Sequence, residues 1–151
     1  MNDDEEPRLR MGNVHELPWI RSREQDNADG SRSAVLNRIV ASAPMFVTYT
    51  RYEPGMLLAR HSHQADEVIY ILEGEVRVGE QLWTEGTVAI LEAGAFFGPL
   101  VAGPKGALLF EVFNGRPERV GQDRSGWDAL KAERGVTELP NPDYSLPEDA
   151  I

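Results

Sequence analysis

The residues best suited to chemistry are concentrated in residues 55–74. His61 and His63 are two positions apart, so in a β-strand both imidazoles point to the same face. Glu67 follows after three residues that suit a turn, and it opens the apolar run 68–72, which is typical of a next strand. Neutral imidazole and carboxylate are both good ligands for divalent first-row ions. The spacing therefore predicts a metal site where a hairpin brings the three side chains together.

The order and spacing of these residues match a known motif. Taken along the chain, its fixed positions are Gly55, His61, His63, Glu67 and Gly74. They agree at every defining position with the first conserved motif of the cupin family, so the chain resembles that family over about residues 33–114. The resemblance implies a double-stranded β-helix, the jelly-roll barrel, with His61, His63 and Glu67 as metal ligands.

Residues 86–97 follow the spacing of the second cupin motif with two changes. Glu92 stands where that motif has a proline, and Phe97 stands where it has a histidine. The resemblance then implies three protein ligands instead of four. Two histidines and one carboxylate suit non-haem Fe(II) and leave positions for substrate and dioxygen. The ring of Phe97 cannot bind a metal, so it is expected to form a wall of the pocket or part of the core.

Three functions are compatible with this pattern. The resemblance favours a dioxygenase-like oxidoreductase that acts on a small molecule and uses Fe(II), with Zn, Mn or Ni as other candidate ions. The second is a non-catalytic ligand-binding or sensor cupin that keeps the histidines as polar lining. The third is a metal-dependent isomerase or lyase. The motif alone does not separate them, because function depends on the site and not on the fold.

Strand alternation extends the candidate pocket beyond the metal ligands. If Glu67 faces inward, Ile69 and Ile71 do so as well. Glu111, in the last strand, is a candidate to accept a hydrogen bond from a ligand histidine and orient it. His15 is the remaining histidine, and we expect it on the surface of an N-terminal arm, with a role as a further ligand as the alternative.

The strand that precedes the motif offers two inward-facing sets. Tyr49 and Arg51 lie on one face of this strand, and Thr48 and Tyr52 lie on the other. Alternation does not decide between them, and the first set, Tyr49 and Arg51, is the predicted pocket lining.

Short β-strands must position all of these side chains. Apolar and β-branched runs recur between Gly and Pro residues, which is typical of an all-β sandwich or barrel. Expected strands are 35–40, 45–52, 56–63, 67–72, 75–78, 81–83, 87–91 and 107–113, with turns at Gly74 and at 103–106. We expect an N-terminal arm, 1–32, disordered over 1–12 and with a loop at 21–33. The barrel spans 33–114, and 115–151 hold one short helix at 125–135 and an extended tail.

Composition restricts the classes of partner. The 151 residues suffice for one domain, no apolar run is long enough to cross a membrane, and a net charge of -10 argues against nucleic-acid binding. The acidic N-terminus is unlike a targeting signal, and the lack of cysteine excludes disulfides and agrees with a cytoplasmic protein. Strands such as 68–72 are apolar on both faces, and the resemblance implies that a homodimer covers the outer one.

Overall fold

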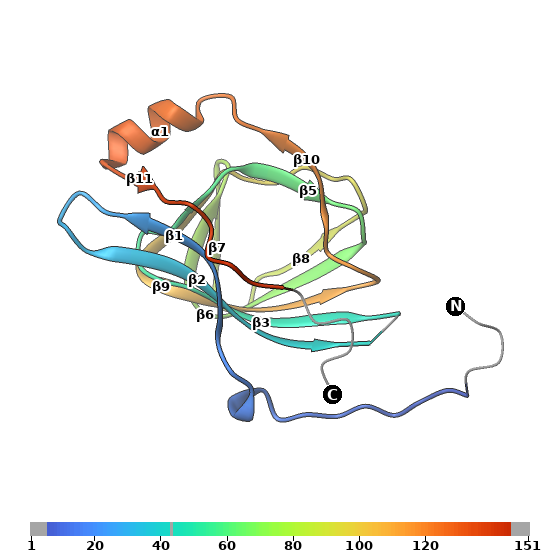
Figure 1. The fold of residues 1–151 in the computed structure, drawn as a ribbon. Coiled ribbons are helices and arrows are strands. Elements are labelled where there is room, and N and C mark those ends of the chain that lie inside the picture. The colour runs from blue at the N-terminus through green and yellow to red at the C-terminus, as the bar shows by residue number, and fades with distance from the viewer. Residues whose placement is uncertain (1–5, 43, 146–151) are drawn as a thin grey trace.

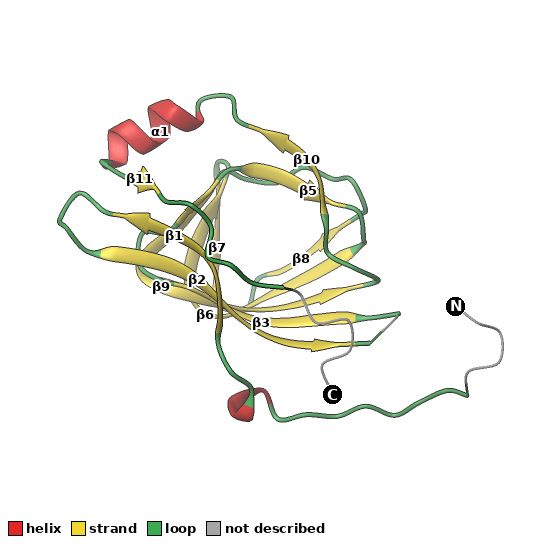
Figure 2. Cartoon of the chain, viewed as in Figure 1, coloured by secondary structure: helices red, strands yellow, loops and turns green. Residues whose placement is uncertain are grey.

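The structure is a computed structural model that describes residues 6–42 and 44–145. β-strands curl around a common interior, with one α-helix at the edge, and the all-β jelly-roll barrel expected from the sequence is confirmed (Figures 1 and 2). No helix in these two ranges is long and apolar enough to cross a membrane. The predicted N-terminal disorder falls partly on residues 1–5, outside the described residues, while residues 6–13 have no regular secondary structure.

The elements follow one another along the chain as mostly short strands. They are η1 (Val14–Glu16), β1 (Ile20–Asp26), β2 (Arg32–Ala41), β3 (Phe46–Tyr52), β4 (Leu57–Leu58), β5 (Arg60–His63), β6 (Glu67–Val78), β7 (Gln81–Thr84), β8 (Val88–Leu91), β9 (Leu100–Phe113), β10 (Arg119–Asp123), α1 (Trp127–Arg134) and β11 (Thr137–Glu138).

Two sheets enclose the interior. The larger has the strand order β11-β1-β2-β3-β9-β6-β7, with β4 added to β9 and β8 added to β6, and the smaller pairs β5 with β10. All pairings are antiparallel. In Figure 1 the β5–β10 pair lies across the interior from β3, β6 and β9. The histidine strand β5 therefore faces the strands that carry Glu67 and Glu111.

The structure corrects the prediction at four places, where a polar or glycine-rich segment forms or continues a strand. β1 and the first residues of β2 occupy most of the segment 21–33 that was expected to be a loop, because the two backbones pair while the side chains of β1 remain mostly polar. β10 was not expected at all, and it forms by pairing with β5. β6 continues through Gly74 and β9 through residues 103–106, where the register shifts take the place of the expected turns.

Two clusters of buried apolar side chains fill part of the interior. Large inward side chains such as Ile69, Ile71 and Leu109 are almost fully buried and pack in one cluster with Phe97. Phe46 and Phe113 belong to a second, smaller cluster. Burial of such side chains provides most of the driving force for folding.

The chain outside the barrel packs against its surface. Trp19, just before β1, stacks on Tyr49 with ring centroids 5.9 Å apart, and Arg38 lies over the Trp19 ring. Helix α1 buries Trp127 against Leu57 and Val101, and Gly135 ends the helix in a left-handed conformation, as its position predicted. The tail after β11, described as far as residue 145, has no regular secondary structure.

Candidate metal and ligand site

His61 and His63 point from β5 into the interior. The two imidazole centroids are 5.0 Å apart and the rings are nearly perpendicular. His61 is buried and His63 is half-buried, and β10 and Phe97 flank this short strand through backbone pairing. The alternation expected from the sequence therefore brings the two histidines to one face.

Backbone carbonyls fix the orientation of both rings. His61 Nδ1 lies 2.7 Å from the carbonyl oxygen of Ala59, and His63 Nδ1 lies 2.7 Å from that of Pro117. A carbonyl only accepts, so each Nδ1 carries the hydrogen and each Nε2 keeps its lone pair. Burial lowers the pKa of His61 to about 3 and also lowers the pKa of His63, which keeps both rings neutral. Neutral imidazoles with free Nε2 atoms are the form that binds metals.

Glu67 is a buried carboxylate without a hydrogen-bond partner. Only 2% of the residue is exposed, and neither Oε1 nor Oε2 accepts a hydrogen bond from any residue that the structure describes. Burial, with the nearby charge of Glu111 as a second cause, raises the pKa of Glu67 to about 9. A buried polar group without a partner costs free energy. A cation would remove that cost by pairing with the carboxylate.

Glu111 has a different role from the one expected. Its Oε2 accepts hydrogen bonds from the hydroxyls of Thr48, at 2.6 Å, and Thr50, at 2.8 Å. The histidines instead donate to main-chain carbonyls, so no contact shows Glu111 orienting them. Burial raises the pKa of Glu111 as well. The register explains the closeness of the two acids, because Glu67 and Glu111 are diagonal neighbours on the inner face of β6 and β9.

The donor chemistry of His61, His63 and Glu67 fits a divalent ion. Two neutral imidazoles offer Nε2 lone pairs, and the carboxylate has no other partner. In residues 6–42 and 44–145, however, no three His, Asp or Glu side chains are already gathered as a metal-binding group. The two imidazoles are thus oriented, whereas Glu67 does not line the cavity in front of them, and the three side chains are not gathered into one group.

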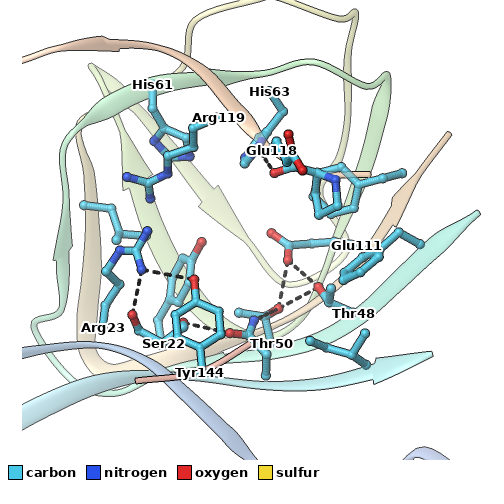
Figure 3. Close-up of a pocket in the computed structure, with 17 residues that line it drawn as sticks. Ser22, Arg23, Thr48, Thr50, His61, His63, Glu111, Glu118, Arg119 and Tyr144 are labelled. Carbon is cyan, nitrogen blue, oxygen red and sulfur yellow. Dashed lines mark hydrogen bonds between the residues drawn. The ribbon is translucent and has the colours of Figure 1, made fainter. Parts of the chain in front are cut away.

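A cavity of about 330 Å³ lies in front of the histidines. Figure 3 shows His61 and His63 on one wall and Thr48, Thr50 and Glu111 on the opposite one. Its lining consists of Ser22, Arg23, Asn37, Ile39, Phe46, Thr48, Thr50, Tyr52, Leu58, His61, His63, Glu111, Phe113, Pro117, Glu118, Arg119 and Tyr144. The volume and the mixed polar and apolar lining are typical of a small-molecule site.

Phe97, Ile69 and Ile71 point inward but lie behind the cavity. All three belong to the apolar cluster, and none lines the cavity. The Phe97 ring centroid is 4.6 Å from that of His61, so the phenyl ring packs on the imidazole. These three residues support the site by packing and do not form part of the cavity wall.

Tyr49 and Arg51 lie on the outer face of β3, and the prediction that they line the pocket is corrected. Thr48 and Tyr52, the other set that alternation allowed, line the cavity. The reason is the arm, because Trp19 stacks on Tyr49 from outside and Arg51 also lies near the Trp19 ring. His15, too, is exposed and meets the outer edge of the Tyr49 ring.

Sequence reasoning missed the polar and charged residues that β1, the start of β10 and the tail bring to the cavity. Arg23 comes from β1, Glu118 and Arg119 from the start of β10, and Tyr144 from the tail. Both strands have polar sequences without an apolar period, so no pattern signalled them. The register of β10 places Arg119 opposite His63, which explains how its side chain reaches the cavity.

The chain is similar to one protein family and to several solved structures with the cupin fold. A family profile described as the ChrR cupin-like domain matches residues 8–115. No curated protein matches the chain.

Among solved structures, a protein of Methylibium petroleiphilum PM1, described as a candidate acetylacetone dioxygenase, has a TM-score of 0.60 and 10% identity. The match covers 83% of this chain and 96% of that one. An RmlC-like cupin of Shewanella frigidimarina has a TM-score of 0.56 and 16% identity, over 74% and 95% of the two chains. Oxalate decarboxylase of B. subtilis, in a variant form, has a TM-score of 0.55 and 19% identity, over 91% and 40%. At these identities the similarity shows the fold alone.

Proposed function

Because the chain belongs to the ChrR cupin-like domain family, we propose that it is a metal-binding cupin whose ion is held by His61, His63 and Glu67. The carboxylate of Glu67 carries this proposal, since both of its oxygens are buried and lack a hydrogen-bond partner. The two Nε2 lone pairs supply the remaining donors. Binding an ion would draw the three ligands together and compensate the buried carboxylate.

We propose further that the site belongs to a small-molecule oxidoreductase of the dioxygenase type, with Fe(II) favoured over Zn, Mn or Ni. When bound, Fe(II) would supply a redox-active Lewis acid with positions for substrate and dioxygen. The main-chain carbonyls of Ala59 and Pro117 hold the imidazoles in place. The buried ring of Phe97 excludes water behind His61. The cavity gives room for a substrate beside the histidines.

A non-catalytic ligand-binding cupin is the second candidate. It is favoured by two observations: no three ligands are gathered in the described part of the chain, and an aromatic ring packs where a fourth ligand would stand. A metal-dependent isomerase or lyase would use the same three ligands without consuming dioxygen. Dioxygen uptake on turnover separates it from the oxidoreductase, and insensitivity of ligand binding to chelators marks the non-catalytic protein.

We also propose that the chain forms a homodimer through the outer face of β6, β8 and β9. The face carries exposed apolar side chains that the register makes neighbours, and we call them the outer apolar patch: Val68, Tyr70, Val88, Ile90 and Phe110. The patch contains no charged residue, although the chain has a net charge of -10. Two copies could meet there without bringing like charges together, and a two-fold axis makes one patch complementary to itself.

Elemental analysis tests the metal site directly. Wild type, His61→Ala and His15→Ala are each reconstituted with iron, manganese, nickel and zinc salts and freed of excess ion. His15 is exposed and lies outside the cavity, so His15→Ala is the matched control. We expect about one ion per chain in wild type and in the control, and a near-complete loss in His61→Ala. A wild-type protein that retains none of these ions would refute the proposal.

A further inference from the structure

Two arginines face each other across one side of the cavity. Figure 3 shows the guanidinium groups of Arg23 and Arg119 turned toward one another, on the side away from Glu111 and Glu118. Burial, and in second place the positive charge of Arg23, lowers the pKa of Arg119 to about 10. Arg119 therefore remains positively charged at neutral pH, and the like charge of a second guanidinium beside it is repulsive.

Within residues 6–42 and 44–145, no acidic side chain forms an ion pair with either arginine. Arg23 donates from Nη1 to the carbonyl oxygen of Ser22 at 2.7 Å and to the hydroxyl of Tyr144 at 3.3 Å. Other arginines of the barrel do form such an ion pair, for example Arg60 with Asp123. Two unneutralised guanidiniums at one cavity form a site for an anion.

The rest of the lining restricts the kind of anion. Ile39, Phe46, Leu58 and Phe113 contribute apolar surface to the same cavity. Glu118, on the far side, would repel a second negative charge at that end. An occupant with one anionic end and an uncharged, largely apolar body meets both requirements, and a volume of about 330 Å³ limits it to a small molecule.

We propose that the cavity binds the anion of a small organic acid, with its carboxylate between Arg23 and Arg119 and its apolar body against the remaining walls. The inference rests on the proposed function, because it names the class of molecule that would be presented to the histidines. Planar guanidinium groups bind carboxylates through paired hydrogen bonds, which orients the ligand as well as holding it. Arg23 on β1 and Arg119 on β10 thus determine the specificity for a carboxylate ligand.

Calorimetric titration of metal-free protein in EDTA tests the anion site separately from the metal site. The probes are acetate, butyrate and benzoate, with benzamide as the neutral counterpart of benzoate and inorganic phosphate as a compact anion. We expect butyrate or benzoate to bind, benzamide to bind at least about tenfold more weakly, and the affinity to fall with added salt. Absence of saturable binding by all three carboxylates would overturn the proposal, and so would equal affinity for benzoate and benzamide. Tighter binding of phosphate would overturn the assignment to a carboxylate.

Variants locate the binding. Arg119 keeps an exposed surface although its guanidinium is partly desolvated beside the cavity, so the fold is expected to tolerate Arg119→Gln, and Arg23→Gln provides the second test. Each is expected to weaken carboxylate binding by about tenfold or more. Arg77→Gln is the matched control, because Arg77 is exposed on β6 and does not line the cavity. Unchanged affinity in Arg119→Gln would refute the site even if wild type binds carboxylates. Since the protein is metal-free, a failure of the metal proposal leaves these results intact.

Discussion

At the scale of single residues, Glu67 is the side chain whose position packing does not explain. A carboxyl group with no hydrogen-bond partner, 2% exposed, is a cost that folding alone does not compensate. Burial raises its pKa to about 9, so at neutral pH the metal-free protein holds it uncharged. Metal binding would convert the same group into a charged ligand. Stability and function therefore make opposite demands on this residue.

Glu67→Gln tests that opposition. The amide replaces an uncharged carboxyl of nearly the same shape, so in EDTA we expect the free energy of unfolding to change by less than about 1 kcal/mol. Metal content after reconstitution is expected to fall to nearly zero, because an amide is a poor ligand. Denaturant unfolding and elemental analysis measure the two effects. If the variant keeps its ion, Glu67 is not a ligand.

Phe97→His tests whether the aromatic ring has replaced a fourth ligand. Phe97 pairs with His61 through the backbone, so an imidazole at that position would lie beside the two existing ones. We expect tighter metal binding, measured by competition with a chelator. In EDTA we expect a loss of about 1–3 kcal/mol in the free energy of unfolding, because a polar ring enters the apolar cluster. Phe96→His is the control, since Phe96 is exposed; equal metal affinity in both variants would contradict the expectation.

The sequence predicted some of these residues well and others not at all. Alternation along β5 and β6 fixed the faces of His61, His63 and Glu67, because strand periodicity is a local property. Arg23 and Arg119 depend on long-range pairing of β1 with β2 and of β10 with β5, and their own segments have no apolar period. Local sequence carries no information about such partners, so the arginine side of the cavity could not be predicted.

At the scale of elements, β6 and β9 show how glycine permits a continuous strand where a turn was expected. Gly74 has φ +72°, and a Cβ at this position would collide with the carbonyl oxygen of Gly106. The two backbones approach so closely because a register shift lies next to Gly74 in the β6–β9 ladder. A glycine between apolar runs is compatible with a turn or with such a bulge, and only the partner strand decides between them.

Gly74→Ala is therefore expected to be costly. Steric overlap with the backbone adds to the strain of positive φ, and we expect a loss of about 2–4 kcal/mol in the free energy of unfolding. Gly86→Ala is the matched control, because Gly86 also has positive φ, +88°, but no atom lies within 4 Å of its added Cβ. The control is expected to lose about 1–2 kcal/mol. Equal losses in urea denaturation would show that the close approach to Gly106 is unimportant.

The end of β10 gives a pH-dependent contribution to stability. Hydrogen bonds from Ser125, its backbone N–H first, and the ion pair with Arg60 lower the pKa of Asp123 from 3.8 to about 2. A lowered carboxyl pKa stabilises the folded state above the unfolded pKa, and the contribution is lost as pH falls from about 4 to about 2. Asp123→Asn should therefore be less stable than wild type near neutral pH, with a difference that narrows in acid. A difference independent of pH in thermal unfolding would contradict this.

At the scale of the whole molecule, the N-terminal arm covers one part of the outer surface of the barrel and leaves the neighbouring part uncovered by the described residues. The arm places Trp19 on Tyr49 and so covers the outer face of β3. Tyr49 is the register neighbour of Phe110, at which the outer apolar patch begins. Ile90 within that patch is 76% exposed, a large value for an aliphatic side chain in a sheet. The Trp19–Tyr49 contact and the outer apolar patch are therefore contiguous across the β3–β9 pairing, which favours a second copy as the cover of the patch.

Ile90→Lys tests the proposed dimer. A lysine on β8, the edge strand of the patch, would be buried in the proposed interface once in each copy, and burial of an unpaired charge costs several kcal/mol. We expect wild type to have twice the 16.8 kDa mass of one chain in light scattering after gel filtration, and the variant to have the mass of a monomer. Since Ile90 is exposed in the single chain, the variant should fold normally. Leu82→Lys, an exposed residue of β7 outside the patch, should remain dimeric, and a monomeric wild type would refute the interface.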